Sequence, residues 1–377
     1  MPYWRLSGFY FFYFATVGAL IPYWGLYLKS IHFTAAEIGQ LMALLALSRI
    51  VAPNVWGWFA DVRGNYMGLV QFAAACSVLA FLGVFVSTGF WWLAAVMLAF
   101  AIFWDACLPQ LEAATLNHLA GRTQAYARIR LWGSIGFIVT VTGLGQLFDR
   151  VPIWWLLPGL LTLLLLVSGF TLLIPESDMR KPRAEYSSFL KVFLRAEVAA
   201  FLAACFLMQA SHGPYYTFYS IYLEDFGYSK SLIGALWALG VVCEIGVFLL
   251  MHQIQLRVGL RQILWVSFAV AALRWLLIGH FPEYLGVLVF AQMLHALTFG
   301  AYHAAAIALI HQFFTGHHQV RGQAIYSSVS FGLGGAIGSF YSGMTWSSLG
   351  PKGTFGIASL LALLALVIAL VAIKRET

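Results

Sequence analysis

The chain has 377 residues, of which 62% are hydrophobic and only 9% are charged, and its mean hydropathy is +0.84. This composition excludes an ordinary soluble domain and indicates an integral membrane protein. The net charge of +7 is then explained by basic loops that contact anionic lipid, and not by nucleic-acid binding.

Long apolar runs divide the chain into twelve predicted membrane spans. Each run is about 20 residues long, the length that crosses a hydrocarbon core of roughly 30 Å as a helix. A transmembrane β-barrel would show alternating segments of about 10 residues, so we expect an all-α membrane protein. The predicted spans are 6–28, 35–60, 67–87, 91–116, 126–148, 152–174, 197–223, 229–252, 262–280, 284–311, 321–346 and 351–373.

Basic residues outside these spans gather on one side of the membrane. Most of them, including the cluster from Arg180 to Arg195, fall on the side that also holds both termini. By the positive-inside rule this side is the cytoplasm, so we expect a multi-pass protein of the cell inner membrane with both termini cytoplasmic. The first span is long enough to cross and has no small-residue cleavage site, so we expect a retained helix.

The longest polar stretch separates six spans from six. It predicts a central cytoplasmic loop, 175–196, between a first domain, 1–174, and a second domain, 197–377. The second half aligns on the first with Gly213 opposite Gly18, which indicates an internal repeat in the same orientation. Two parallel repeats of six helices are typical of secondary transporters built from two bundles.

A short motif follows the second span. The segment Gly57-Trp-Phe-Ala-Asp61-Val-Arg63-Gly64 resembles the G-x-x-x-D-x-x-G signature of the major facilitator superfamily, although the basic residues that usually follow the second glycine are absent. The resemblance implies two six-helix bundles, and Asp61 would act as a conformational latch at the cytoplasmic helix end. An ordinary helix-ending turn is the alternative.

Three further segments carry a narrower resemblance. They are residues 127–136, the run Pro22-Tyr-Trp, and the pattern of His295 and His303 in the tenth span. Together they resemble the 3-phenylpropionate permease family, which is related to the lactose permease and nucleoside proton symporters. This implies proton-coupled symport of a small organic anion such as an aromatic acid. A sugar or nucleoside proton symporter and a non-transporting sensor on the same fold are the alternatives.

Ionisable residues inside the spans are the candidate site residues. A charge at membrane depth costs roughly 2.5 to 3.5 kcal/mol even on the most lenient scale, so such residues usually line a polar pathway. We expect Arg130 or Arg49 to bind the carboxylate of the substrate, because a planar guanidinium suits bidentate capture. We expect Glu112 and Asp105 to hold these arginines, while a purely structural Glu112–Arg130 salt bridge is the alternative.

A second group in the later spans is the candidate for proton coupling. Arg274 and His295 resemble positions of the proton-handling cluster of lactose permease, but Thr298 stands where that permease carries its proton-accepting glutamate. We therefore expect Glu244 to carry the proton, with Arg274 nearby, and His295 to be the second candidate. For His303, a hydrogen bond to a neighbouring span is an equal alternative.

Aromatic residues and a predicted helix break complete the candidate substrate contacts. Tyr23 and Tyr216 are placed to stack on an aromatic substrate, with simple packing as the alternative. His212 lies beside Pro214, where a break would free backbone carbonyls.

No phosphate-binding loop, nucleophile elbow or metal motif occurs in the sequence, so we expect no enzyme, no cofactor and no metal. The expected partners are a small-molecule substrate, protons and membrane lipid. We expect a monomer.

Overall fold

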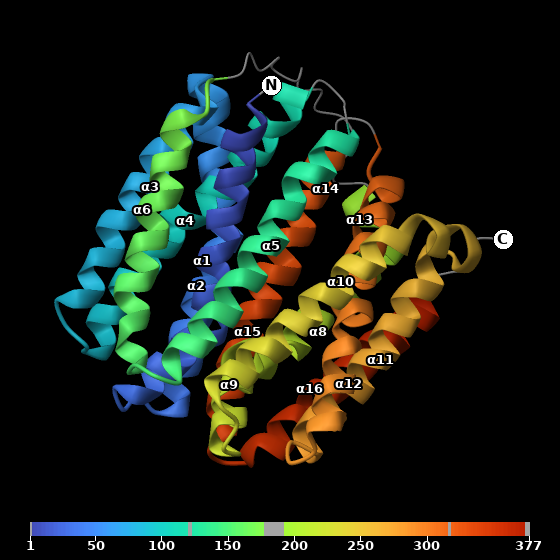
Figure 1. Ribbon diagram of the computed structural model, residues 1–377. Helices are drawn as coiled ribbons and strands as arrows, with labels where there is room; N and C mark the ends of the chain where they lie inside the picture. Colours follow the sequence, from blue (N-terminus) through green and yellow to red (C-terminus); the bar gives the residue numbers. More distant parts are fainter. Residues whose placement is uncertain (1, 120–122, 177–191, 316–317, 374–377) are drawn as a thin grey trace. The chain divides into compact units, whose positions relative to one another are not determined.

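The structure is a computed structural model that describes the whole chain except residues 1, 120–122, 177–191, 316–317 and 374–377 (Figure 1). Within the described residues the protein is helical and contains no β-strand. This confirms the expected all-α class. The chain separates into two compact units, one of residues 1–181 with 228–235 and the other of residues 182–227 with 236–377. Most of the predicted central loop, 175–196, lies outside the described residues.

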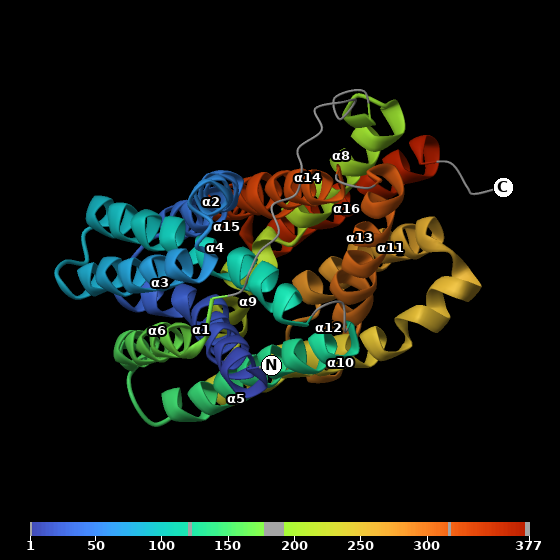
Figure 2. The same cartoon turned by 90° about the horizontal axis from the view of Figure 1, so that it is seen from above.

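The described part of unit 1 contains six long helices, two short 3₁₀ turns and the first turn of α10. α1 packs against α5 and α6, while α4 packs against α2 and α3 (Figure 1, Figure 2). The elements are α1 (Tyr3–Ser30), α2 (Ala35–Arg63), α3 (Tyr66–Leu82), η1 (Gly83–Phe85), α4 (Phe90–Leu119), α5 (Thr123–Phe148), η2 (Ile153–Trp155) and α6 (Leu156–Leu173).

Local sequence signals define the ends of α2 and the close packing of α1 on α5. Thr34 and Glu37 form a capping box at the start of α2, and Gly64 ends it in the left-handed conformation at φ 68°. A Cβ on Gly136 would lie 2.1 Å from the carbonyl oxygen of Phe11, so only glycine allows this approach of α5 to α1.

Unit 2 contains more interruptions than unit 1. Its helices begin and end near the predicted span boundaries, but two of the predicted spans, 284–311 and 321–346, each contain a π-helical segment. The elements are α8 (Ala196–Ser211), α9 (Gly213–Asp225), α10 (Lys230–Val258), α11 (Leu260–His280), α12 (Leu285–Met293), the π-helix η3 (Ala296–Ala301), α13 (Tyr302–Phe313), α14 (His318–Ser327), the π-helix η4 (Ser328–Gly334), α15 (Gly335–Trp346) and α16 (Gly350–Ala372).

Every predicted span contains helix, but only ten helices of the described chain are long and apolar enough to cross a membrane. The two others are the predicted spans 197–223 and 321–346. The first is broken at His212, where α8 ends and Pro214 opens α9, as the sequence predicts. The second begins with the polar helix α14 and continues through η4, whose sequence is Ser-Val-Ser-Phe-Gly-Leu-Gly. The first is thus divided into two short helices, and the second is too polar to count as a long apolar helix.

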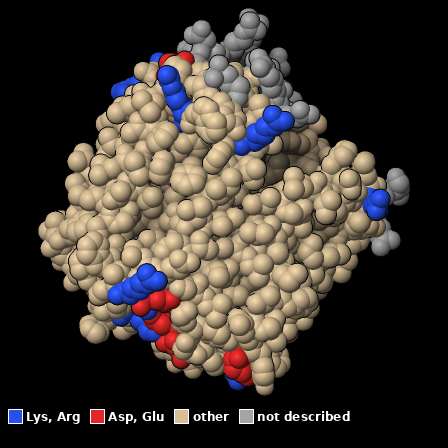
Figure 3. All heavy atoms as spheres, viewed as in Figure 1, with Lys and Arg blue, Asp and Glu red and all other residues tan. Residues whose placement is uncertain are grey.

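Charged side chains avoid the sides of the helices. On the face drawn in Figure 3, Lys, Arg, Asp and Glu lie toward the helix ends, and the surface between them carries other residues. Large apolar side chains such as Leu79, Trp91 and Leu249 are exposed, each at more than two thirds of its surface. Such a surface suits contact with lipid tails.

The first turn of α10 belongs to unit 1, where Asp149 caps it. The carboxylate accepts hydrogen bonds from the backbone N–H of Lys230 at 2.7 Å and of Ser231 at 3.1 Å, and from the Ser231 hydroxyl. Burial raises the pKa of Asp149, but the hydrogen bonds from Ser231 and Lys230 outweigh it and hold that pKa below its ordinary value of 3.8. A side chain from beyond α5 therefore satisfies the free N–H groups that begin α10.

Candidate functional site

Arg49 and Asp105 meet between α2 and α4 in unit 1. The Nε atom of Arg49 lies 3.7 Å from Oδ1 of Asp105, and the Ser48 hydroxyl donates a hydrogen bond of 2.5 Å to Oδ2. The Asp105 side chain is only 10% exposed, whereas that of Arg49 is 44% exposed. The buried carboxylate thus has both a cation and a hydroxyl to stabilise it, and the guanidinium keeps an open side.

Arg130 and Glu112 also come together, between α5 and α4. Nε of Arg130 lies 4.0 Å from Oε1 of Glu112, and each side chain is 35% exposed. Tyr126 donates a hydrogen bond of 3.5 Å to the same carboxylate oxygen. At this distance the ion pair is loose, so it leaves guanidinium N–H groups that another acceptor can use.

The ring of Phe14 packs against the Arg130 guanidinium. Its carbon Cζ lies 4.0 Å from the ring centroid of Phe14, a cation–π contact. Gly133, one helical turn after Arg130, makes this possible. A Cβ at that position would lie 2.7 Å from Cδ2 of Phe14 and 2.9 Å from Nη1 of Arg130. Sequence reasoning missed Gly133, although its spacing of three residues from Arg130 places both on one helix face.

The predicted aromatic contact Tyr23 is fully buried within unit 1. Its hydroxyl donates a hydrogen bond of 2.6 Å to the carbonyl of Val141, and its ring packs edge-on against Phe148 at 5.2 Å. These contacts join α1 to α5. A substrate-stacking role for Tyr23 stays a prediction, and the structure gives the residue a packing contact.

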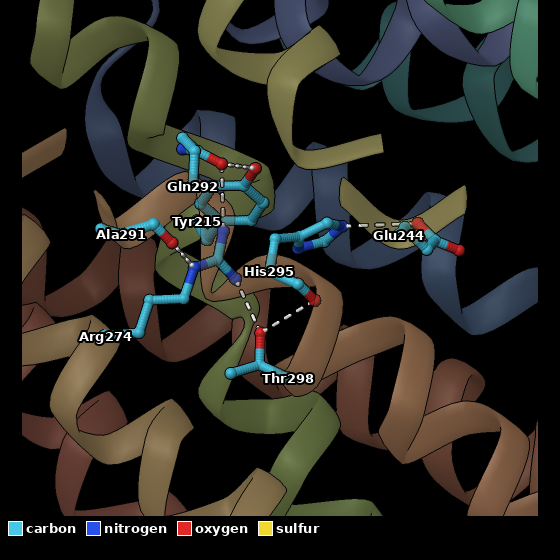
Figure 4. Close-up of polar contacts among 7 residues, drawn as sticks. All are labelled: Tyr215, Glu244, Arg274, Ala291, Gln292, His295 and Thr298. Atoms are coloured by element: carbon cyan, nitrogen blue, oxygen red, sulfur yellow. Dashed lines mark hydrogen bonds and ion pairs between the residues drawn. The ribbon is translucent and has the colours of Figure 1, made fainter. Parts of the chain in front are cut away.

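Arg274 is the centre of the polar cluster in unit 2 and is fully buried (Figure 4). The cluster draws on α9, α11, α12 and η3. The guanidinium donates hydrogen bonds to the carbonyl of Ala291 at 2.9 Å, to the hydroxyl of Thr298 at 3.1 Å and to Oε1 of Gln292 at 3.3 Å. It also lies 4.3 Å from the ring centroid of Tyr215 and 4.8 Å from that of Trp275.

Glu244 lies within ion-pair distance of His295. Oε2 of Glu244 lies 3.8 Å from Nε2 of His295, and the side chains are 16% and 7% exposed. All the described hydrogen bonds of Arg274 go to uncharged acceptors. Arg274 is turned toward the acceptors of α12 and η3, and His295 stands between it and Glu244 in Figure 4.

The backbone of η3 builds this arrangement. Its π-helical winding begins directly after His295 and contains Thr298. Such segments insert an extra residue into a helix and are frequent at functional sites. On the same segment Gly300 leaves room for Glu244, because a Cβ there would lie 2.9 Å from its Cγ. The sequence does not reveal a π-helix, since it has no characteristic periodicity.

His212 occupies the break between α8 and α9. Its Nδ1 lies 2.8 Å from the carbonyl oxygen of Met208, and because a carbonyl only accepts, Nδ1 carries the proton. The ring lies edge-on to Trp275 at 4.8 Å and stacks on Tyr216 at 5.7 Å. Nε2 of His212 is buried and has no hydrogen-bond partner in the described part of the chain.

His303 lies two turns beyond His295 and has different neighbours. Its Nδ1 is 3.2 Å from the hydroxyl of Tyr326, and its ring stacks on Phe299 at 6.1 Å. The structure thus gives His303 the interhelical hydrogen bond that was the alternative to a proton-coupling role. That coupling role stays a prediction.

The predicted latch lies at the end of α2. Gly57 and Asp61 fall within the helix, and Arg63 is its exposed last residue. The N–H of Gly64 donates a hydrogen bond of 2.8 Å to the carbonyl of Ala60, which closes the turn. The side chain of Asp61 lies outside the described part of the structure. The latch role therefore stays a prediction.

Across the described residues, no three His, Cys, Asp or Glu side chains gather in a way that could hold a metal ion. Two helical units with charged pairs inside apolar helices define a membrane transport protein. The chain belongs to the MFS_1 like family, whose family model matches residues 3–357. It is therefore a multi-pass transporter of the major facilitator superfamily and not an enzyme.

Individual relatives agree with this assignment. The chain is 32% identical over 375 residues to a probable 3-phenylpropionic acid transporter of Escherichia coli (strain K12), covering 95% of this chain and 94% of that protein. It is 24% identical over 330 residues to a maltose permease of Geobacillus stearothermophilus, covering 86% and 83%. The crystal structure of the nucleoside transporter NupG superimposes with a TM-score of 0.86 at 17% identity over 100% of both chains. The predicted major facilitator fold is confirmed.

Proposed function

We propose that this transporter is a proton-coupled symporter that takes up a small organic anion, such as an aromatic acid, by alternating access. The observation that carries the proposal is the environment of the Arg130 side chain. Its guanidinium is partly exposed, only loosely paired with Glu112 and stacked on Phe14. A cation with free N–H groups beside an aromatic ring suits a ligand that combines a carboxylate with an aromatic ring.

Arg49 supplies a second cation in unit 1. Its guanidinium is the more exposed partner of the Asp105 pair, and Asp105 is also stabilised by Ser48. Arg49 is thus able to turn toward a substrate carboxylate without leaving Asp105 unpaired. The similarity to a probable 3-phenylpropionic acid transporter supports an aromatic acid as the substrate.

Glu244 is the proposed proton carrier in unit 2, with His295 as its partner. Both side chains are largely buried, and they lie within 4 Å of each other. The ionised form of Glu244 is stabilised by a protonated His295, whereas protonated Glu244 is uncharged and needs no neighbouring cation. A change in exposure during the transport cycle would then load and release the proton.

Topology and assembly belong to the same proposal. The excess of Lys and Arg between spans supports cytoplasmic termini and a location in the inner membrane. We also propose that each chain acts as a monomer, because each bundle pair in this class encloses its own substrate pathway.

Uptake of radiolabelled 3-phenylpropionate into proteoliposomes tests the proposal. An imposed inward proton gradient should drive accumulation above that in protein-free liposomes, which report passive diffusion of the undissociated acid. A protonophore should abolish this difference. Arg130→Gln should reduce the apparent affinity roughly 10- to 100-fold, the loss expected for a charge-assisted hydrogen bond.

The matched control is Arg128→Gln, because Arg128 lies on the same helix with an exposed side chain. It should transport like the wild type. Uptake no greater than in protein-free liposomes would overturn the organic-acid assignment, while the fold would be unaffected.

A sugar or nucleoside proton symporter is the second candidate. The Glu112–Arg130 pair favours it, since a carboxylate and a guanidinium together can bind several hydroxyl groups. A maltose permease and a xanthosine permease are among the relatives. Proton-driven uptake of a neutral sugar or nucleoside that persists in Arg49→Gln would select this candidate, and absence of any coupled uptake would point to a sensor.

A further inference from the structure

The described contacts of Arg274 leave its charge without an adjacent anion. The side chain is fully buried, and its three described hydrogen bonds reach a carbonyl, a hydroxyl and an amide oxygen. Its guanidinium also faces the rings of Tyr215 and Trp275. These groups orient a cation but do not neutralise it, and a buried cation requires a nearby negative charge.

The charges around Arg274 can be counted. Glu244 is the acidic residue on α10, and His295, which directly precedes η3, lies between it and the guanidinium. His212 is neutral, because its Nδ1 donates to a carbonyl and its Nε2 has no partner among the described residues. Tyr215 from α9 is an uncharged phenol. With Glu244 ionised, the cluster has no net charge, and one added proton makes it a monocation.

Two buried nitrogen atoms of this cluster point to a ligand. Nε2 of Gln292 and Nδ1 of His295 have no hydrogen-bond partner in the described structure, and both side chains are more than nine tenths buried. The orientation of the Gln292 amide is fixed, since its Oε1 accepts from Arg274 and from the Tyr215 hydroxyl at 3.0 Å. Its NH₂ group is therefore a donor that lacks an acceptor.

The facing side of α10 carries no side chain at this point. A Cβ on Gly240 would lie 3.2 Å from Cδ2 of His295 and 3.3 Å from Oε1 of Gln292. Glu244 follows one turn later on the same helix. Glycine at this position therefore lets the backbone of α10 pack closely against Gln292 and His295, on the helix that also carries Glu244.

We propose that Arg274, Gln292 and His295 form a site in unit 2 for one monovalent anion, which binds together with one proton taken up by the Glu244–His295 pair. Protonation of the pair removes the negative charge that balances Arg274, and the anion replaces it. A protonated His295 also donates from both ring nitrogens, so Nδ1 becomes a donor to the anion. By reciprocity, anion binding then promotes proton uptake to the same extent.

The bound anion is either the carboxylate of the substrate or an inorganic anion such as chloride. Both present one negative charge to N–H donors, and the test separates them. The site goes beyond the proposed transport function, because it stands whether or not 3-phenylpropionate is the transported acid.

The experiment adds sodium 3-phenylpropionate, sodium chloride or 3-phenylpropionamide to the purified full-length protein in weakly buffered detergent solution. A pH electrode records proton uptake, and tryptophan fluorescence reports binding, since Trp275 adjoins Arg274. We expect about one proton to be taken up per anion bound, and none with the uncharged amide. A response to chloride identifies an inorganic anion site, and a response to 3-phenylpropionate alone identifies the substrate carboxylate.

The decisive variant is Gln292→Glu, which has the same shape and supplies a fixed negative charge at the guanidinium. It should weaken anion binding about 100-fold or more and abolish anion-linked proton uptake. Gln312→Glu adds the same charge at an exposed position of unit 2 and should behave like the wild type.

Wild-type anion binding and proton uptake in Gln292→Glu would overturn the site, and so would anion binding by the wild type without proton uptake. Failure here is separable from failure of the transport proposal. Proton-driven 3-phenylpropionate uptake that is unchanged in Gln292→Glu would remove the anion site alone. If the wild type shows no proton-driven uptake of 3-phenylpropionate but still takes up a proton when chloride binds, only the substrate assignment is wrong.

Discussion

The guanidinium carbon of Arg274 lies over the ring of Tyr215, 4.3 Å from the ring centroid, and both side chains donate a hydrogen bond to the same oxygen of Gln292. The phenol therefore contributes in two ways: its ring faces the cation, and its hydroxyl orients the amide that accepts from it. The two contributions can be separated by substitution.

Tyr215→Phe should keep the cation–π contact and lose only the hydrogen bond to Gln292. We expect the stability of the purified protein to fall by about 1 kcal/mol, the usual net value of one hydrogen bond. Tyr215→Leu should cost more, because it also removes the ring from Arg274 and from Trp237 at 4.5 Å. Thermal unfolding in detergent measures both. Equal losses for the two variants would show that the hydroxyl alone matters.

Gly133→Ala should disturb Arg130 without removing it. The added methyl group would collide with Phe14 and with the guanidinium, so the stacked arrangement must shift. We expect a higher KM for the aromatic acid with a smaller change in the maximal rate, because binding geometry is affected. Gly143→Ala is the matched control on the same helix, since nothing lies within 4 Å of its Cβ position. Wild-type KM in Gly133→Ala would show that the Phe14 stack does not position Arg130.

Gly300→Ala should displace Glu244 from His295. A Cβ at Gly300 would lie 2.9 Å from Cγ of Glu244, which forces that side chain to move. We expect fewer protons to be transported per substrate molecule, with substrate exchange retained. Parallel measurements of proton flux and labelled-substrate flux give this ratio. Gly286→Ala, an open position on α12, should leave the ratio unchanged.

Asp149→Asn should change how stability depends on pH. The folded-state pKa of Asp149 lies below its ordinary value of 3.8, so its ionised form contributes stability above that value. The contribution is lost as pH falls through the folded-state pKa. The variant should therefore melt at a lower temperature than the wild type at neutral pH, and the two should converge in strong acid. Melting curves across pH measure this.

The control for Asp149 is Asp225→Asn, which removes an exposed acid at the end of α9. It should not reproduce the pH dependence. A constant difference between Asp149→Asn and wild type at all pH values would mean that the cap acts through shape and not through charge.

Parts of this architecture follow directly from the sequence, and others do not. Apolar runs locate the helices because the bilayer sets their length, and Pro214 predicts the break at His212 because proline lacks an N–H. Depth along the helices also predicts that Glu112 and Arg130 meet. The partners of Arg274 are not predictable in this way, since they depend on the π-helical winding of η3.

Glycine positions illustrate the same limit. Gly133 and Gly300 matter through the neighbour that a methyl group would strike, and these neighbours come from other helices. The sequence shows many glycines in apolar helices, and only the packed structure distinguishes those beside Arg130 and Glu244 from those that face open space.

The most direct test of the central claim compares accumulation and exchange of 3-phenylpropionate in proteoliposomes containing Glu244→Gln, with Glu283→Gln as the exposed control. Values in protein-free liposomes are subtracted. We predict that Glu244→Gln loses proton-driven accumulation but still exchanges labelled for unlabelled substrate, while Glu283→Gln does both. Full accumulation in Glu244→Gln would contradict the assignment of Glu244 as the proton carrier.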